Sequence, residues 1–169
     1  MLLGGEGIDT VSYAGSDAGV TINLGKVTAA CFSEGIGGHA DGDVLNGFEN
    51  VYGSVYDDTL TGDDGDNVLW GNGGNDVLTG GAGDDTLCGG SGWDTFVMTK
   101  GGGHDTITDF QTLFGAKDVI DFSDFGIGYA DLVIQNQAGG TLITTPTGES
   151  VFLEGVNAAN LNPADDFIF

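Results

Sequence analysis

Oxygen-bearing side chains recur at every ninth position through the middle of this sequence. Aspartate or asparagine stands at five such positions, and an apolar residue follows each of them two residues later. Carboxylate and amide oxygens in a regular array are suited to bind a hard divalent cation. The array therefore predicts metal binding in preference to glycosidase-type carboxylate catalysis. Its five positions are Asp58, Asn67, Asp76, Asp85 and Asp94.

The repeat that carries these oxygens runs without interruption over residues 53–97, and each of its five units begins with glycine. A Gly-Gly-x-Gly run reaches positive φ values cheaply, so the first part of each unit is expected to be a tight loop. The rest of the unit is a short strand with one inward apolar side chain. Two loops and two strands close one flattened coil, and stacked coils place these side chains in a ladder: Leu60, Leu69, Leu78, Leu87 and Phe96.

Such a core is thin. One apolar side chain per strand offers little burial against the conformational entropy lost by ordering the whole backbone. Stacked carboxylates add repulsion to this balance. A hard dication held by carboxylate and carbonyl oxygens supplies the missing stabilisation, and calcium is the natural choice.

Similar units lie outside the regular array. Residues 4–12 read GGEGIDTVS and contain Asp9, whereas residues 100–108 read KGGGHDTIT and contain Asp105. The pattern is degenerate between the first unit and the array, where Asp43 precedes a shortened strand-like segment. Asp9, Asp43 and Asp105 therefore join the candidate metal ligands.

The units GGAGDDTLC and GGSGWDTFV match the nonapeptide G-G-x-G-x-D-x-U-x, where U is a large apolar residue. In this respect the chain resembles the RTX (repeat-in-toxin) family. The resemblance implies an all-β fold, a right-handed parallel β-roll with a β-rich C-terminal cap. It also implies several calcium ions, each held between loops on the same edge of the roll and two repeats apart.

Carried over by this resemblance, the carboxyl pairs are Asp58 with Asp76, Asp76 with Asp94, and Asp85 with Asp105. A pair of Asn67 with Asp85 would be weaker, because Asn67 is neutral. Tyr56 stands where the first array unit should have glycine, which leaves that loop a doubtful carbonyl donor. Loop backbone positions complete the expected ligand set: Gly62, Asp64, Gly65, Gly71, Gly73, Gly74, Gly80, Gly81, Ala82, Gly83, Gly89, Gly90, Ser91 and Gly92.

The chain is expected to have three parts. Residues 1–52 form degenerate coils, residues 53–97 the regular array and residues 98–169 a cap of short strands, with a hairpin turn at Gly139-Gly140. The final residues 165–169 read DDFIF, an acidic pair followed by apolar residues. They resemble the uncleaved C-terminal signal of type I secretion substrates, so we expect a secreted, extracellular protein whose partner is a type I secretion ABC transporter. No N-terminal leader pattern is evident.

Composition narrows the function classes. A formal net charge of −23 makes nucleic acid and anionic membranes poor partners, and no segment is long and apolar enough for membrane insertion. No metalloprotease H-E-x-x-H or lipase G-x-S-x-G motif occurs, so we expect this chain not to be an enzyme. His39 and His104 read as exposed turn residues. Cys31 and Cys88 read as small apolar residues, although a disulfide is not excluded.

Two alternatives remain open at this point. Aspartates in turns often cap their own backbone, although five units in one register favour metal binding. A calcium-dependent polysaccharide-binding or adhesin module is the second functional hypothesis, since modules similar to this one accompany mannuronan epimerases. Trp70 and Trp93 could stack on sugars, whereas loop and edge packing is the simpler interpretation.

Overall fold

The computed structural model describes residues 1–25, 33–113 and 116–169. Cys31, one of the two cysteines discussed above, lies outside the described residues. The described part consists of β-strands, loops and short 3-10 turns. None of its helical segments has the length and apolar character needed to cross a membrane.

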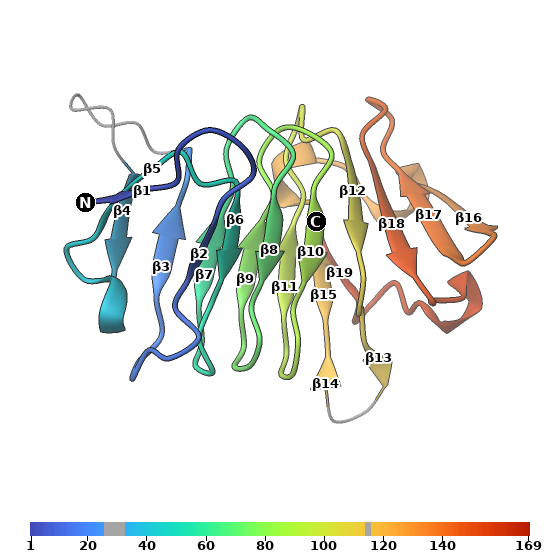
Figure 1. Cartoon of the computed structure of the whole chain (residues 1–169). Helices are drawn as coiled ribbons and strands as arrows, with labels where there is room; N and C mark the ends of the chain where they lie inside the picture. Colours follow the sequence, from blue (N-terminus) through green and yellow to red (C-terminus); the bar gives the residue numbers. More distant parts are fainter. Residues whose placement is uncertain (26–32, 114–115) are drawn as a thin grey trace.

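The nonapeptide array forms short strands that alternate between two sheets (Figure 1). Each strand has three residues, and its middle residue is buried while its neighbours are more exposed. This burial pattern follows from the alternation of side chains along a strand. The five strands are β7 (Thr59–Thr61), β8 (Val68–Trp70), β9 (Val77–Thr79), β10 (Thr86–Cys88) and β11 (Thr95–Val97).

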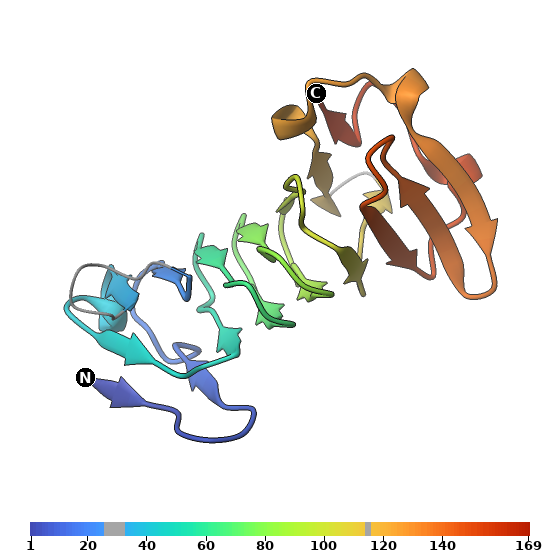
Figure 2. The same cartoon turned by 90° about the horizontal axis from the view of Figure 1, so that it is seen from above.

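Neighbouring strands within each sheet of the array are parallel and in register. Leu60 lies opposite Leu78 in one sheet, and Leu69 lies opposite Leu87 in the other. The coils follow one another from the N-terminal end to the C-terminal cap (Figure 2). The sheet orders are β1-β5-β4-β3-β7-β9-β11-β15-β19 and β16-β17-β18-β12-β10-β8-β6-β2, and β13 pairs with β14 separately. The expected parallel β-roll is confirmed.

The core of the roll is the predicted apolar ladder. Leu69 and Leu87 of one sheet and Leu60, Leu78 and Phe96 of the other are all 0% exposed. Because each strand of the array contributes one inward side chain, the ladder is only one side chain wide in each sheet. The ladder holds the coils together but leaves the fold with a small apolar interior.

The array loops require glycine where neighbouring coils meet. Gly83 has a φ of 107°, and a Cβ atom at this position would lie 2.7 Å from the backbone carbon of Gly65. A side chain there would therefore meet both a strained backbone and a neighbouring coil. Asn72, at the second position of its unit, takes a φ of 74°, a region that asparagine tolerates better than most residues.

The N-terminal coils continue both sheets less regularly. β2 (Thr10–Ser12) and β6 (Asn50–Tyr52) extend one sheet, and β3 (Thr21–Asn23) extends the other. Beyond β3, the strand β4 (Ser33–Ile36) runs antiparallel to both of its neighbours. The remaining elements are β5 (Val44–Asn46), β1 (Leu2–Leu3) and the turn η1 (Gly38–Ala40).

The C-terminal cap grows directly out of the roll. β12 (His104–Ile107) and β18 (Ser150–Glu154) continue one sheet in parallel, and β15 (Val119–Asp121) continues the other. Antiparallel hairpins then join β16 (Val133–Gln137), β17 (Gly140–Thr144) and β18, with the predicted turn at Gly139, whose φ is 91°. Smaller elements are β13 (Thr112–Leu113), β14 (Ala116–Lys117), η2 (Ser123–Phe125), η3 (Tyr129–Asp131) and η4 (Ala158–Asn160).

The chain terminus is the last strand of this cap. β19 (Phe167–Ile168) pairs in parallel with β15, and the Phe122 ring lies 6.3 Å from Phe167 and 6.1 Å from Phe169 between centroids. These contacts gather aromatic side chains at the end of the nine-stranded sheet, where β19 is the edge strand. The two-residue length of β19 leaves little unpaired edge at this end of the solenoid.

The thin ladder makes a stability prediction. Replacing the fully buried Leu78 with alanine removes a rung, and we expect the free energy of unfolding in saturating calcium to fall by about 2–5 kcal/mol. Val55→Ala is the control, because Val55 is 62% exposed and its loss should cost less than about 0.5 kcal/mol. Denaturant unfolding followed by circular dichroism measures both values. Equal stability of the two variants would contradict the view that the apolar ladder stabilises the fold.

Candidate metal centre

The aspartates on one edge of the roll stack into a column. The backbone N–H of Asp58 donates to Oδ1 of Asp76 at 2.8 Å, and that of Asp76 donates to Oδ1 of Asp94 at 2.9 Å. The next bond runs from the Asp94 N–H to Oδ1 of Asp118 at 3.1 Å. Each carboxylate is thus held by the coil before it, and one of its two oxygens is committed to this backbone bond.

The opposite edge carries a second column. The Asn67 N–H donates to Oδ1 of Asp85 at 2.8 Å, and the Asp85 N–H donates to Oδ1 of Asp105 at 3.1 Å. The structure therefore brings together side chains two repeats apart on the same edge. These are the residues that the resemblance to the RTX family paired.

The second oxygen of three of these carboxylates has no partner. Oδ2 of Asp76, Asp85 and Asp94 is buried and accepts no hydrogen bond. The three residues are only 1–2% exposed. An unpartnered buried carboxylate oxygen is costly, because it has lost water and gained nothing in return. A cation is the partner that such an oxygen requires.

A small space next to each unpartnered oxygen is left open by the glycine that begins the unit. A Cβ atom built on Gly71 would contact Oδ2 of Asp76 and lie 2.5 Å from the carbonyl oxygen of Gly89. A carboxylate oxygen and a carbonyl oxygen of the next coil therefore both lie beside this glycine, and both are oxygen types that calcium accepts as ligands. The corresponding point at Gly80 contacts Oδ2 of Asp85, and that at Gly89 contacts Oδ2 of Asp94.

The electrostatics of the columns favour a bound cation. Burial raises the pKa of Asp76 to about 7, and the neighbouring Asp94 and Asp58 add to this effect while a backbone hydrogen bond opposes it. Burial likewise raises the pKa of Asp85 to about 6 and that of Asp105 to about 7. The negative charge is disfavoured at these positions, and a dication nearby would reverse that.

The donor set distinguishes between metals. Within residues 1–25, 33–113 and 116–169, no three histidine, cysteine or acidic side chains converge on one point. Zinc sites are built from such side-chain clusters, whereas calcium accepts backbone carbonyls and few carboxylates. The carboxylate and carbonyl oxygens of the loops fit calcium.

Comparison with known proteins agrees with this chemistry. The family model for the RTX calcium-binding nonapeptide repeat matches residues 43–78, 52–87 and 70–97. The chain is also 31% identical to the AlgE6R3 subunit of the Azotobacter vinelandii mannuronan C5-epimerase, over 68% of this chain and 78% of that one, with a TM-score of 0.28. This chain belongs to the RTX calcium-binding repeat family.

A second solved structure similar to this RTX chain is the extracellular lipase LipA of Serratia marcescens. Its sequence is 19% identical and its TM-score is 0.42. The match covers 99% of this chain but only 33% of the lipase, so this RTX chain spans about a third of that protein. A search of curated protein sequences found no match.

The backbone positions predicted as RTX loop ligands lie where consecutive loops touch. On one edge, Gly73 forms a bridge with Ser91, and the Gly74 N–H donates to the Ser91 carbonyl at 3.0 Å. On the other edge, the Ala82 N–H donates to the Asp63 carbonyl at 2.9 Å. Cβ atoms on glycines of the later loops would meet backbone of the loop before, as at Gly81, Gly83, Gly90 and Gly92.

The first two loops of the array differ from the later RTX loops. Oδ1 of Asp58 accepts hydrogen bonds from the Val20 N–H and the Ser54 hydroxyl, and Oδ2 accepts one from the Ser54 N–H at 2.5 Å. Asn67 Oδ1 accepts the Asp63 N–H at 2.8 Å. The self-capping alternative considered from sequence therefore describes these two side chains.

Four other predicted positions lie apart from the unpartnered oxygens of the array. Asp43 joins neither column, because β4 separates β5 from β3, and its Oδ2 accepts the Tyr13 hydroxyl at 2.9 Å. Asp64 and Gly65 are exposed, within a loop where the Asp63 side chain accepts the Gly65 N–H. Asp9 has a buried Oδ2 without a partner, at the irregular N-terminal end of the roll.

Sequence reasoning missed three acidic residues of this site. Asp118 ends the first column and is 0% exposed, and the run Asp-Val-Ile in which it stands is the half-unit that could have revealed it. The Glu49 carboxylate accepts the Asp9 backbone N–H at 2.8 Å, the same kind of bond that the column aspartates accept. Asp109 accepts the Gly89 and Gly90 N–H groups, and the thiol of Cys88 lies 3.1 Å from its Oδ2. His39 and His104 are both exposed, as predicted, but only His39 lies in a turn, because His104 is the first residue of β12.

Adding a methyl group at one of these glycines should remove one calcium site. In Gly71→Ala the new methyl group would occupy the space between Oδ2 of Asp76 and the Gly89 carbonyl, although the φ of Gly71 is open to any residue. We expect isothermal titration calorimetry to count fewer bound calcium ions than in the parent. Gly15→Ala is the matched control, since nothing lies within 4 Å of its Cβ position. An unchanged ion count in Gly71→Ala would contradict the location of the site.

The raised pKa values predict how the metal-free chain responds to acid. Because the folded-state pKa of Asp76 is about 7 and that of Asp85 about 6, against an ordinary value near 4, protonation favours the metal-free fold. This stabilisation is fully present below the ordinary value and is lost as the pH rises through about 6–7. In chelator, circular dichroism should show β structure increasing from about pH 8 to about pH 5. The double variant Asp76→Asn, Asp85→Asn should respond less, and an equal response would contradict this origin.

Proposed function

We propose that this chain is a calcium-dependent folding module, without catalytic activity of its own, that supports type I secretion of an extracellular protein. The observation that carries the proposal is the set of buried, unpartnered Oδ2 atoms at Asp76, Asp85 and Asp94. Each of these oxygens approaches the glycine that begins its unit, and at Gly71 the carbonyl oxygen of Gly89 lies there too. The folded state would therefore gain the stability it lacks only when a cation binds.

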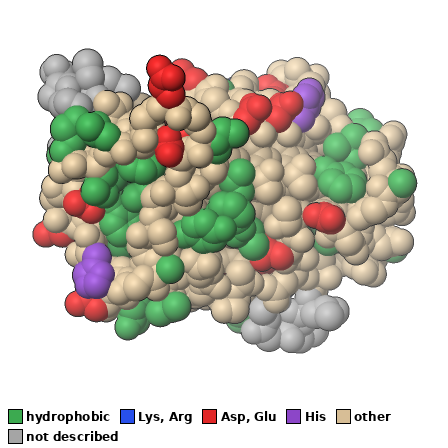
Figure 3. Space-filling view, in the orientation of Figure 1, with side chains coloured by type: hydrophobic (Ala, Val, Ile, Leu, Met, Phe, Trp, Pro, Cys, Tyr) green, Lys and Arg blue, Asp and Glu red, His purple; other side chains and the backbone are tan. Residues whose placement is uncertain are grey.

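The charge of the chain supports a switch between two states. At a net charge of −23, the metal-free chain repels itself, and acidic side chains are spread over the face shown in Figure 3. Free calcium in a cell is far below the roughly 10⁻⁴–10⁻³ M at which extracellular calcium modules are half-saturated. The chain would thus remain unfolded until export, and binding free energy would then become folding free energy.

The C-terminal segment fits export before folding. Asp166 is 1% exposed and Phe167 is 7% exposed, and β19 pairs with β15, so the centre of the terminal segment is buried in the folded cap. A type I transporter could contact these two side chains only while the chain is unfolded. The same residues would therefore serve first as a secretion signal and afterwards as the closing strand.

A second candidate function is calcium-dependent binding of a polysaccharide. It is supported by the 31% identity to a subunit of a mannuronan C5-epimerase and by the exposed side chain of Trp93, which borders a pocket. The two functions are compatible, because folding on calcium would assemble the surface that binds.

The folding switch is tested by calcium titration. Chelated chain at neutral pH should show little β signal in circular dichroism, and calcium should produce the signal cooperatively, because stacked coils share ions and neighbours. Magnesium should substitute poorly, since it requires a small octahedral shell and loses its water reluctantly. A chelated sample with the full β signal would overturn the proposal.

The secretion role is tested by separating the signal from the stability of the cap. Deletion of residues 166–169 should reduce export through a type I transporter, measured as the secreted fraction in a reconstituted system. Phe122→Ala removes the aromatic partner of Phe167 and Phe169 but leaves the terminal residues intact, and export should persist. Equal export of the deletion variant and the parent would remove the signal hypothesis.

A further inference from the structure

A pocket of about 450 Å³ lies where the last loop of the array meets the C-terminal cap. Trp93 lines it from the roll, and the cap contributes Thr112, Lys117, Asn160 and Asp165, among others. Its size falls within the roughly 300–1,000 Å³ of small-molecule sites. No aspartate of the two carboxylate columns lines this pocket.

Trp93 interrupts a regular ladder of exposed side chains. Oδ1 of Asp57 accepts the Asn75 N–H at 2.7 Å, and Oδ1 of Asn75 accepts the Trp93 N–H at 2.9 Å. Tryptophan offers no acceptor to continue this ladder. Its side chain is instead 63% exposed, so the fold gains little from a large ring at this position. An aromatic ring exposed at the edge of a pocket is a common contact for the apolar face of a ligand.

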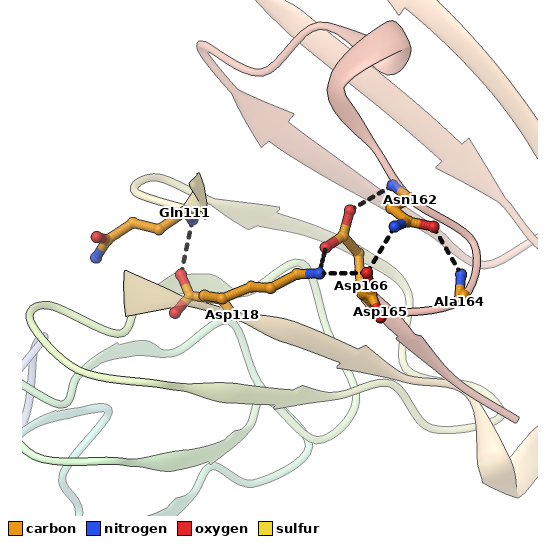
Figure 4. A network of polar contacts seen from close by, with 7 residues as sticks. Gln111, Asp118, Asn162, Ala164, Asp165 and Asp166 are labelled. Carbon is orange, nitrogen blue, oxygen red and sulfur yellow. Dashed lines mark hydrogen bonds and ion pairs between the residues drawn. The ribbon is translucent and has the colours of Figure 1, made fainter. Parts of the chain in front are cut away.

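The opposite wall of the pocket is a rigid polar network (Figure 4). The Lys117 ammonium lies 3.2 Å from Oδ2 of Asp165 and 3.2 Å from Oδ1 of Asp166. Oδ1 of Asp166 accepts no hydrogen bond, so this ion pair is what compensates its burial. Asn162 donates its backbone N–H to Asp166 and its side-chain amide to Asp165, at 2.5 and 2.6 Å. These contacts hold the wall in one arrangement before any ligand arrives.

Other polar groups around the pocket remain uncommitted. The Thr112 hydroxyl and the Asn160 side-chain amide have no hydrogen-bond partner within the part of the chain that the structure describes. Lys117 has three N–H donors, of which the two aspartates use two. The pocket thus combines one aromatic face with several free donors and acceptors.

We propose that this pocket binds a neutral saccharide, with a sugar ring stacked on Trp93 and its hydroxyls bonded to Asn160, Thr112 and Lys117. A sugar presents both an apolar C–H face and a rim of donors and acceptors, which matches this lining. Charge decides against an anionic sugar, because two carboxylates outnumber one ammonium here and the whole chain carries −23. The inference rests on the calcium-dependent fold and narrows the second candidate function to neutral polysaccharides, in contrast to the anionic mannuronan named for the similar epimerase subunit.

Binding at this pocket should depend on calcium. Trp93 stands between Gly92 and Asp94, and Oδ2 of Asp94 is buried without a partner. A cation bound to Asp94 would order this loop and so fix the position of the Trp93 ring. Binding linkage is reciprocal. If calcium raises the affinity of the chain for the saccharide by some factor, the saccharide must raise the affinity of the chain for calcium by the same factor.

The experiment uses Trp93 fluorescence in a Trp70→Phe background, where Trp93 is the only tryptophan. Trp70 stacks on Tyr52 at 4.1 Å between ring centroids, and phenylalanine preserves that stack. In saturating calcium the probes are cellotetraose, maltotetraose, mannotetraose and chitotetraose, together with tetramannuronate as an anionic probe and tetralysine as a cationic one. We expect a saturable response to at least one neutral tetrasaccharide, none to tetramannuronate, and none to any probe in chelator.

Two variants locate the site. Calorimetry should show that Trp93→Ala loses affinity by about tenfold, as expected for one aromatic stack, and that Asn160→Ala loses affinity severalfold. Trp70→Phe should bind the neutral tetrasaccharide like the parent. Trp93→Ala must keep the calcium-induced β signal, which excludes simple unfolding.

The remaining outcomes overturn the proposal. A normal calcium-induced β signal without any response to a neutral tetrasaccharide removes the saccharide site but leaves the folding function intact. A response to tetramannuronate or tetralysine alone assigns the pocket to a charged ligand instead. Absence of the calcium-induced β signal would overturn the folding function and this inference together.

Discussion

The structure depends on carboxylate oxygens that are buried without a protein partner. One oxygen of each column aspartate accepts a backbone N–H from the preceding coil, and this bond fixes the side chain in place. At Asp76, Asp85 and Asp94 the second oxygen lies against the glycine that begins the unit. A side chain at that glycine would clash with the oxygen. Stacking of the coils and the need for a cation are consequences of the same geometry.

The rest of the fold compensates for how little the roll can bury. A ladder with one inward residue per strand has no thick core, and each coil contacts only its neighbours. The cap supplies what the ladder lacks. It extends both sheets, adds antiparallel hairpins, and packs aromatic side chains around Phe122 at the end of one sheet. It also satisfies the last loop with Asp109 and Asp118, whose oxygens accept its backbone N–H groups.

The junction of roll and cap is where metal binding and ligand binding can be coupled. The loop that ends with Asp94 contributes both an unpartnered carboxylate oxygen and the exposed ring of Trp93. The cap holds its own wall of the pocket through Lys117 and two aspartates. Neither wall forms a site alone, so a calcium-dependent fold would make a calcium-dependent pocket.

The sequence by itself determined the parallel roll, the spacing of its ladder and the oxygen chemistry of its loops. These features repeat, and a period is visible without coordinates: Asp76 and Leu78 recur as Asp85 and Leu87 one unit later. Tertiary structure decided which acidic residues meet. Asp118 enters a column after an irregular insertion, Glu49 replaces an aspartate, and Asp43 is separated by the antiparallel strand β4. It also decided that Trp93 and Lys117 line the same pocket. These relations join residues far apart in the chain through non-repeating loops, so the sequence pattern alone does not show that the residues meet.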